Sequence, residues 1–156
     1  MIRIKRIDHV AICVADVDAA KGVWERALGI EGTVTEAVAS QATNAMLMPV
    51  GDGETSLELI SPFTPAQGGS GASGLDKFLA KRGPGLHHVA IEVEGIEDAL
   101  TWLKSLGVRL IDETPRVGAR GHKVAFVHPA ATGGVLVELV GSASGTSHAP
   151  GEGSAL

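Results

Sequence analysis

The sequence predicts an α+β fold made of two tandem βαβββ modules, because the chain repeats itself. Residues 7–14 and 86–93 both contain a His followed by Val-Ala-Ile and a closing Val, with His9 and His88 79 positions apart. A segment that contains Trp and ends in Leu-Gly follows each of them, and the sequences LELI at 57–60 and VELV at 137–140 close the two halves at nearly the same offset. Three matches at one offset indicate an internal duplication.

The first copy sets the expected order of elements. Residues 7–14 are rich in β-branched side chains, which predicts a strand, and we expect a helix to cover the face that carries Val10. Asp16 or Asp18 can cap that helix, and Gly29 ends it. The remaining expected elements are strands at 33–38, 45–50 and 55–60, with a hairpin turn at 51–53.

The second copy repeats this order after a Gly- and Ser-rich linker at 63–85, which contains a short helix. Residues 142–156 have little to bury and are expected to form a disordered tail. We therefore expect one domain over 1–141. Its parts are module one at about 5–62, the linker helix at 75–81, and module two at about 86–141, with a strand at 86–93, a helix at 96–106 and strands at 108–112, 123–128 and 135–140.

Composition excludes several classes of function. The net charge of −5 and the absence of a basic run argue against a nucleic-acid partner. A single cysteine, Cys13, excludes an internal disulfide framework and agrees with a reducing compartment. No apolar run is long enough to span a membrane, and the first residues do not resemble a secretion signal. The sequence therefore predicts a cytoplasmic protein that does not bind membranes.

Four residues of the duplicated segments predict a metal site. Each copy has a His near its start, His9 or His88, and a Glu near its end, Glu58 or Glu138, on apolar segments where a lone charge is costly. A pseudo-twofold axis between the copies would bring all four together. Two imidazoles and two carboxylates suit a divalent Co, Ni, Mn, Zn or Fe ion and leave coordination positions open for a substrate. The competing interpretation is that the histidines are hydrogen-bonded core or surface residues and the glutamates face solvent.

Other polar residues receive structural interpretations. His87 follows the alternation of a strand and is expected to point away from His88. His122 and His128 are expected in loops, where His128 can bond the turn before Pro129. Cys13 shares a strand face with His9 and is interpreted as a small core residue.

These residues and their order resemble the vicinal oxygen chelate superfamily, which includes glyoxalase I, extradiol dioxygenases and bleomycin resistance proteins. Within it the chain is most similar to the methylmalonyl-CoA epimerase family. The segments that carry the resemblance are 8–12, 77–79, 85–90, 115–116, 118–119, 123–129 and 133–139.

The resemblance implies a fold and a reaction. The two modules would join their sheets into a curved, half-open barrel around one divalent metal ion, held by His9, Glu58, His88 and Glu138. The implied activity is epimerisation of methylmalonyl-CoA or a related 2-substituted acyl-CoA, by abstraction of the α-proton through a metal-stabilised enolate. Glu138 would serve as a ligand and a base, and the family implies a homodimer. Arg116, Arg120, His122 and Lys123 surround glycines and would either receive CoA phosphates or a substrate carboxylate, or form a solvated basic turn.

One position departs from the family pattern. Ser40 stands where the epimerases have a Glu that is thought to be a catalytic base, and a hydroxyl cannot remove a carbon-bound proton unaided. Glu36 is a substitute only if the register of its strand differs. Two alternatives therefore stay open: a glyoxalase-type isomerase or lyase of another small substrate, and a non-catalytic, resistance-type protein that binds a ligand.

Overall fold

The computed structural model describes residues 1–142, which form one eight-stranded sheet with three α-helices. Apart from Ser142, the expected disordered tail lies outside the described residues. The elements are β1 (Arg3–Cys13), α1 (Val17–Leu28), β2 (Glu36–Val38), β3 (Thr43–Val50), β4 (Thr55–Pro62), α2 (Gly74–Arg82), β5 (Gly85–Glu94), α3 (Ile96–Ser105), β6 (Arg116–Val117), β7 (Lys123–Val127) and β8 (Val137–Gly141), with 3-10 turns η1 (Ala39–Gln41), η2 (Pro65–Gln67), η3 (Ala119–Gly121) and η4 (Pro129–Ala131).

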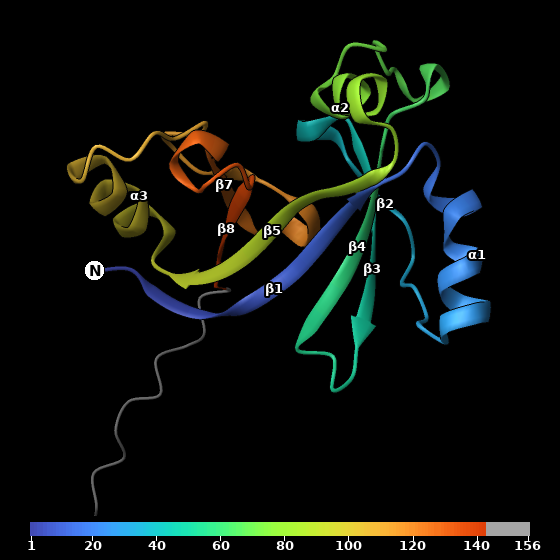
Figure 1. Cartoon of the computed structure of the whole chain (residues 1–156), viewed down its shortest axis with the longest axis horizontal. Coiled ribbons are helices and arrows are strands. Elements are labelled where there is room, and N and C mark those ends of the chain that lie inside the picture. The colour runs from blue at the N-terminus through green and yellow to red at the C-terminus, as the bar shows by residue number, and fades with distance from the viewer. Residues whose placement is uncertain (143–156) are drawn as a thin grey trace, which may run out of the picture.

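The order of strands shows the duplication in space. The sheet runs β2-β3-β4-β1-β5-β8-β7-β6, with β1 parallel to β4, β5 parallel to β8, and β1 antiparallel to β5. Each half therefore has the same pairing on either side of the β1–β5 seam. Figure 1 shows β1 and β5 as a curved pair through the centre, with α1 on one side and α3 on the other. The predicted fold class, two βαβββ units joined into a curled half-barrel, is confirmed.

One predicted strand is shorter than expected, and another is wrong. The predicted strand at 33–38 shortens to β2, and Val34, which precedes β2, is 89% exposed and buries no side chain there. At 108–112 only Leu110 makes an isolated bridge, to Val127, and the third strand of the second half is β6 instead. The Asp112 carboxylate accepts the backbone N–H of Phe126 (2.8 Å), which replaces a regular ladder there.

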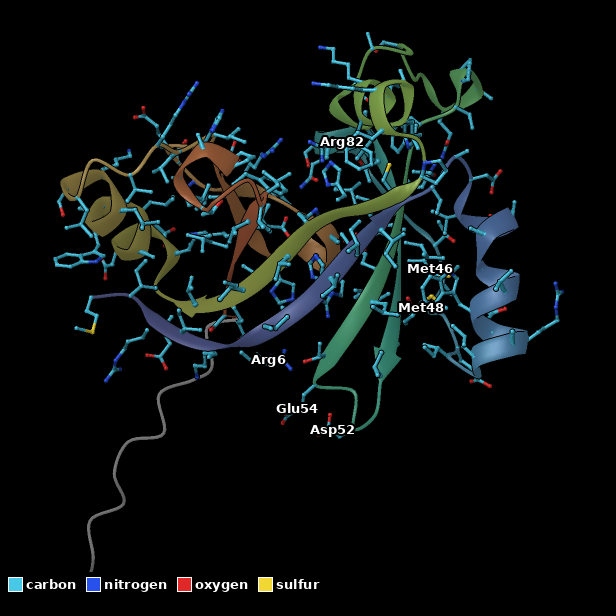
Figure 2. The ribbon with its side chains drawn as sticks, in the orientation of Figure 1. Arg6, Met46, Met48, Asp52, Glu54 and Arg82 are labelled. Carbon is cyan, nitrogen blue, oxygen red and sulfur yellow. The ribbon has the colours of Figure 1, made fainter. Side chains whose placement is uncertain are left out.

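Alternating side chains give the sheet one face that packs against α1 and α3 and an opposite face that carries both polar and apolar residues. Ile12 packs with Met46, Met48 and Leu59 under α1, as the helix-facing side of the first strand requires. Figure 2 shows Met46 and Met48 between the sheet and α1. The buried residues Val93, Leu100, Ala125 and Leu139 form the corresponding core under α3. The residues between these core positions therefore point to the opposite, concave face.

α2 and the core next to it seal one end of this face. Leu75 is buried, and Phe78 and Leu79 pack with it against Ala11 and Cys13. The interpretation of Cys13 as a core residue is confirmed, since its side chain is completely buried. Burial raises the pKa of its thiol to about 11, which keeps it protonated near neutral pH.

Candidate metal centre

The concave face holds a cavity of about 260 Å³ that is lined by residues of both halves. His9 comes from β1, Glu58 from β4, His88 from β5 and Glu138 from β8, so the four central strands each supply one side chain. All four residues are at most 7% exposed. The structure therefore brings together, in one buried place, the four residues that the duplication singles out.

The donor atoms of these side chains converge. The Nε2 of His9 lies 3.2 Å from Glu58 Oε2, 3.2 Å from Glu138 Oε2 and 3.2 Å from His88 Nε2. The Nε2 of His88 lies 3.4 Å from Glu138 Oε2. His9, His88 and Glu138 form the tightest group, with one ligand atom of each within 4.8 Å of the others, and Glu58 joins it through His9. Such a group can hold a metal ion.

The charges around His9 favour a cation at this place. Burial alone would lower the pKa of His9, but its contacts with the carboxylates of Asp8, Glu138 and Glu58 raise that pKa to about 12. Burial likewise opposes the charge of Glu138, yet hydrogen bonds from His88 and His9 lower its pKa to about 2. A buried excess of carboxylates needs positive charge, and a donor set of two imidazoles and two carboxylates is one that divalent transition metals accept. The residues present fit such an ion.

A β-bulge precedes each of the two histidines. Along the β1–β5 pair, Ile7 faces Ile91 and His9 faces Ala90, so that Asp8 is the extra residue on β1. Ala11 faces His88 and Ile12 faces Leu86, so that His87 is the extra residue on β5. A bulge interrupts the alternation of side chains between the two faces of a sheet. Asp8 and His87, at equivalent positions of the repeat, therefore line the cavity together with the histidines that follow them.

Each extra residue contacts the Nδ1 atom of the histidine that follows it, on the side of the ring away from the centre of the site. The Nδ1 of His9 lies 2.9 Å from Asp8 Oδ2, and the Nδ1 of His88 lies 2.9 Å from the Nδ1 of His87. Burial lowers the pKa of His87 to about 4, with a further contribution from His88, so His87 is a neutral acceptor near pH 7. If an ion replaces the proton at the centre, Nδ1–H donated outward would leave the Nε2 lone pair of each histidine free to face that ion.

The sequence reasoning missed these two residues. The expectation that His87 points away from His88 is wrong, because strict alternation holds only in a strand without a bulge. The sequence pattern assigned no role to Asp8. The signal that was available is the dipeptide itself: a polar residue stands directly before the His in both copies, as Asp8-His9 and His87-His88.

Ser40 and Glu36 lie outside the cavity lining. The Ser40 hydroxyl donates to the carbonyl oxygen of Val117 (2.6 Å) and thereby ties η1 to β6. Both carboxylate oxygens of Glu36 accept the backbone N–H of Arg120 (3.0 Å each). Gln41, next to Ser40, lines the cavity instead. The carboxylates that reach the cavity are those of Asp8, Glu58 and Glu138.

The basic residues near the glycines divide into two groups. Arg116, Arg120 and His122 line the cavity, whereas Lys123 pairs with Glu97. The Nη2 of Arg120 lies 3.6 Å from Asp8 Oδ2. His128 stays in a loop, as expected, and its Nδ1 accepts the backbone N–H of Ala130 (3.0 Å).

In the part of the chain that the structure describes, no helix is long and apolar enough to cross a membrane.

Comparison with known proteins shows the family of the chain. Residues 8–126 match the Glyoxalase/Bleomycin resistance protein/Dioxygenase superfamily. The chain belongs to this superfamily. Its relatives there include an uncharacterized protein of Bacillus subtilis, 39% identical over 134 residues that cover 86% of this chain and 90% of that protein. The mitochondrial methylmalonyl-CoA epimerase of Bos taurus is 38% identical over 135 residues that cover 86% of this chain and 73% of that enzyme.

A solved structure is similar to this chain in both fold and sequence. A variant of Streptomyces coelicolor methylmalonyl-CoA epimerase, in complex with 2-nitronate-propionyl-CoA, has a TM-score of 0.80 and 32% identity; the alignment covers 90% of this chain and 96% of that chain. The chain is thus a methylmalonyl-CoA epimerase-like member of the superfamily, as its sequence resemblance predicts.

Proposed function

We propose that the protein is a divalent-metal-dependent epimerase of methylmalonyl-CoA or a related 2-substituted acyl-CoA. The observation that carries the proposal is the convergence of His9, His88 and Glu138, with Glu58 beside them, in a buried cavity. The similarity to methylmalonyl-CoA epimerases supports the same reaction, and the solved relative binds an acyl-CoA analogue. The cavity here would receive the acyl group.

The four residues would hold one divalent ion, of Co, Ni, Mn, Zn or Fe. When bound, the ion supplies a Lewis acid that stabilises the negative charge of an enolate. The chain's own contribution is to fix both imidazoles through Asp8 and His87 and to exclude water with the surrounding apolar wall. His9 and His88 act from β1 and β5, the two strands that form the seam between the halves.

Proton transfer would rest on Glu138, whose carboxylate is the one that contacts both histidines. It would accept the proton from C2 of the acyl group on one face. Ser40 occupies the position of the family's base, but its hydroxyl is engaged with Val117 and cannot serve as a base itself. Return of a proton to the opposite face would then depend on another group or on water.

The first experiment is exchange of the C2 proton of methylmalonyl-CoA in D₂O, followed by NMR. We expect exchange with the Co²⁺-loaded wild type and none with Glu138→Gln. If only Ser40→Glu exchanges, the scaffold is that of an epimerase and the natural substrate is another molecule. Absence of exchange from both the wild type and Ser40→Glu would contradict the proposal.

The position of Ser40 also favours a second candidate function. With Ser40 outside the cavity lining, one family base is missing, which suits a glyoxalase-type isomerase or lyase of another small substrate. A non-catalytic, resistance-type binder is the third candidate. Binding of an acyl-CoA that persists after metal removal and in His88→Asn would favour the binder.

We also propose that the protein works as a homodimer in the cytoplasm, without a nucleic-acid or membrane partner. The dimer is the assembly that the epimerase family implies. Light scattering coupled to size exclusion measures the mass in solution, and a monomer at micromolar concentration would contradict the dimer.

A further inference from the structure

We propose that Arg116 binds the free carboxylate of a dicarboxylic acyl-CoA in the cavity and so selects such thioesters over monocarboxylic ones. The inference deepens the proposed function and rests on it for the location of the acyl group. It assigns a ligand chemistry to a residue whose contacts within the protein leave part of its guanidinium unused.

Packing fixes the position of this guanidinium. The Cζ of Arg116 lies 5.3 Å from the centroid of the Phe126 ring, and Phe126 in turn packs edge-to-face on His88 with centroids 5.3 Å apart. Arg116 is therefore separated from a proposed metal ligand by a single aromatic ring. Arg116 and Phe126 both line the cavity, and the Arg116 side chain remains 40% exposed, so a ligand that enters the cavity can reach it.

The hydrogen bonds of Arg116 are incomplete. Its Nη2 lies 3.3 Å from Asp112 Oδ2, an oxygen that also accepts the backbone N–H of Phe126. Within residues 1–142, the Nε of Arg116 is the buried side-chain polar atom that has no hydrogen-bond partner. Leaving a buried N–H unpaired is costly, so the contacts within the protein do not use all the donors of this guanidinium. The rest of the Arg116 side chain, 40% exposed at the cavity, is open to an acceptor on a ligand.

The chemistry of the acceptor follows from the donor. A guanidinium presents several N–H groups in one plane and binds carboxylates and phosphates with charge-assisted hydrogen bonds. The cavity holds a second guanidinium, that of Arg120, which lies beside the Asp8 carboxylate and so next to His9, whereas Arg116 lies beside Phe126. Among thioesters of similar size, the carboxylate is what distinguishes methylmalonyl-CoA from propionyl-CoA.

Calorimetric binding of three ligands tests this proposal. Racemic methylmalonyl-CoA, propionyl-CoA and free CoA all carry the CoA phosphates, but only the first has a carboxylate on the acyl group. We expect the Co²⁺-loaded wild type to bind methylmalonyl-CoA more tightly than propionyl-CoA. Arg116→Gln should weaken the binding of methylmalonyl-CoA by on the order of 10- to 100-fold and change the other two by less than about 2-fold. Arg116→Lys, which keeps the charge, should restore part of the loss.

Controls separate recognition from folding and from the proposed reaction. Arg109→Gln removes the same charge from an exposed position outside the cavity lining and should leave all three dissociation constants unchanged. Co²⁺ affinity measured on each variant reports whether the metal centre is intact. If Arg116→Gln weakened the binding of all three ligands equally, Arg116 would bind the CoA phosphates and not the carboxylate. If it weakened none of them, Arg116 would bind neither group. Both results overturn the proposal. A wild type that shows this carboxylate preference but no C2 exchange refutes the epimerase and not the role of Arg116.

Discussion

Two equivalent residues support the proposed ligand histidines with different chemistry. Asp8 offers a carboxylate to the Nδ1 of His9, whereas His87 offers a neutral imidazole to the Nδ1 of His88. Hydrogen bonding to an anion makes an imidazole a stronger metal ligand than hydrogen bonding to a neutral acceptor does. Arg6 Nη2, 3.3 Å from Asp8 Oδ1, helps to hold that carboxylate in place. The duplicated site is therefore chemically asymmetric.

Replacing Asp8 tests this support directly. Asp8→Asn keeps a hydrogen-bond acceptor for His9 but removes the charge, and we expect Co²⁺ affinity to fall by on the order of 10- to 100-fold. Isothermal titration of the metal-free protein with Co²⁺ measures this affinity. Glu113→Gln removes a carboxylate that pairs with Lys104 on the surface and should leave the affinity unchanged. Equal affinities of the wild type and Asp8→Asn would show that the Asp8 charge does not support the ligand.

The helix caps differ between the two halves although their helices are equivalent. The Asp16 carboxylate accepts the backbone N–H of Ala19 (2.9 Å) at the start of α1, and Gly29, with φ at 68°, ends that helix. The N-cap residue of α3 is Gly95, which has no side chain to accept a capping hydrogen bond. The expected start and end of the first helix are confirmed, because both depend on residues next to the helix in the chain.

Removing the cap of α1 should destabilise the protein. Asp16→Ala should lower the free energy of unfolding by about 1 kcal/mol, since it leaves the N–H of Ala19 without its partner. Asp16→Ser, which can also cap, should recover most of the loss. Urea denaturation followed by circular dichroism measures both variants. Because α1 packs on the face opposite the cavity, Co²⁺ affinity should not change, and a drop in affinity would show that the helix also positions the site.

The whole molecule is organised around the β1–β5 seam. The proposed ligands come from β4 and β1 of the first half and from β5 and β8 of the second, which are neighbours in the middle of the sheet. An ion bound there would join the two halves of the fold. Its binding energy would be available only to the folded chain, because the ligands are far apart in sequence.

Metal binding should therefore raise thermal stability. At a free Co²⁺ concentration 100 times its dissociation constant, we expect a stabilisation of about 2.7 kcal/mol, which corresponds to a rise in Tm of roughly 5 to 10 °C. Addition of EDTA should reverse it. His88→Asn should lose the shift, while His128→Asn, which alters a loop histidine, should keep it. A Tm that does not respond to Co²⁺ in the wild type would contradict the assignment of the site.

From the sequence, the repeated order of most elements and the four residues of the duplicated site can be predicted. Apolar periodicity and turn residues depend on neighbours in the chain, and the duplication of His9 and Glu58 as His88 and Glu138 made a shared site predictable. It did not predict the loss of the strand expected at 108–112, because pairing at a sheet edge depends on partners distant in sequence.

Which other side chains reach the site follows from the folded arrangement of the strands. The bulges at Asp8 and His87 arise from the register between β1 and β5, which no local pattern records. The hydrogen bond from Ser40 to Val117 joins two segments that are distant in the chain. The packing of Arg116 on Phe126 likewise depends on the pairing of strands in the folded sheet. A sequence pattern can therefore name the residues of a duplicated site, whereas the support and selectivity of that site depend on how strands distant in the chain align.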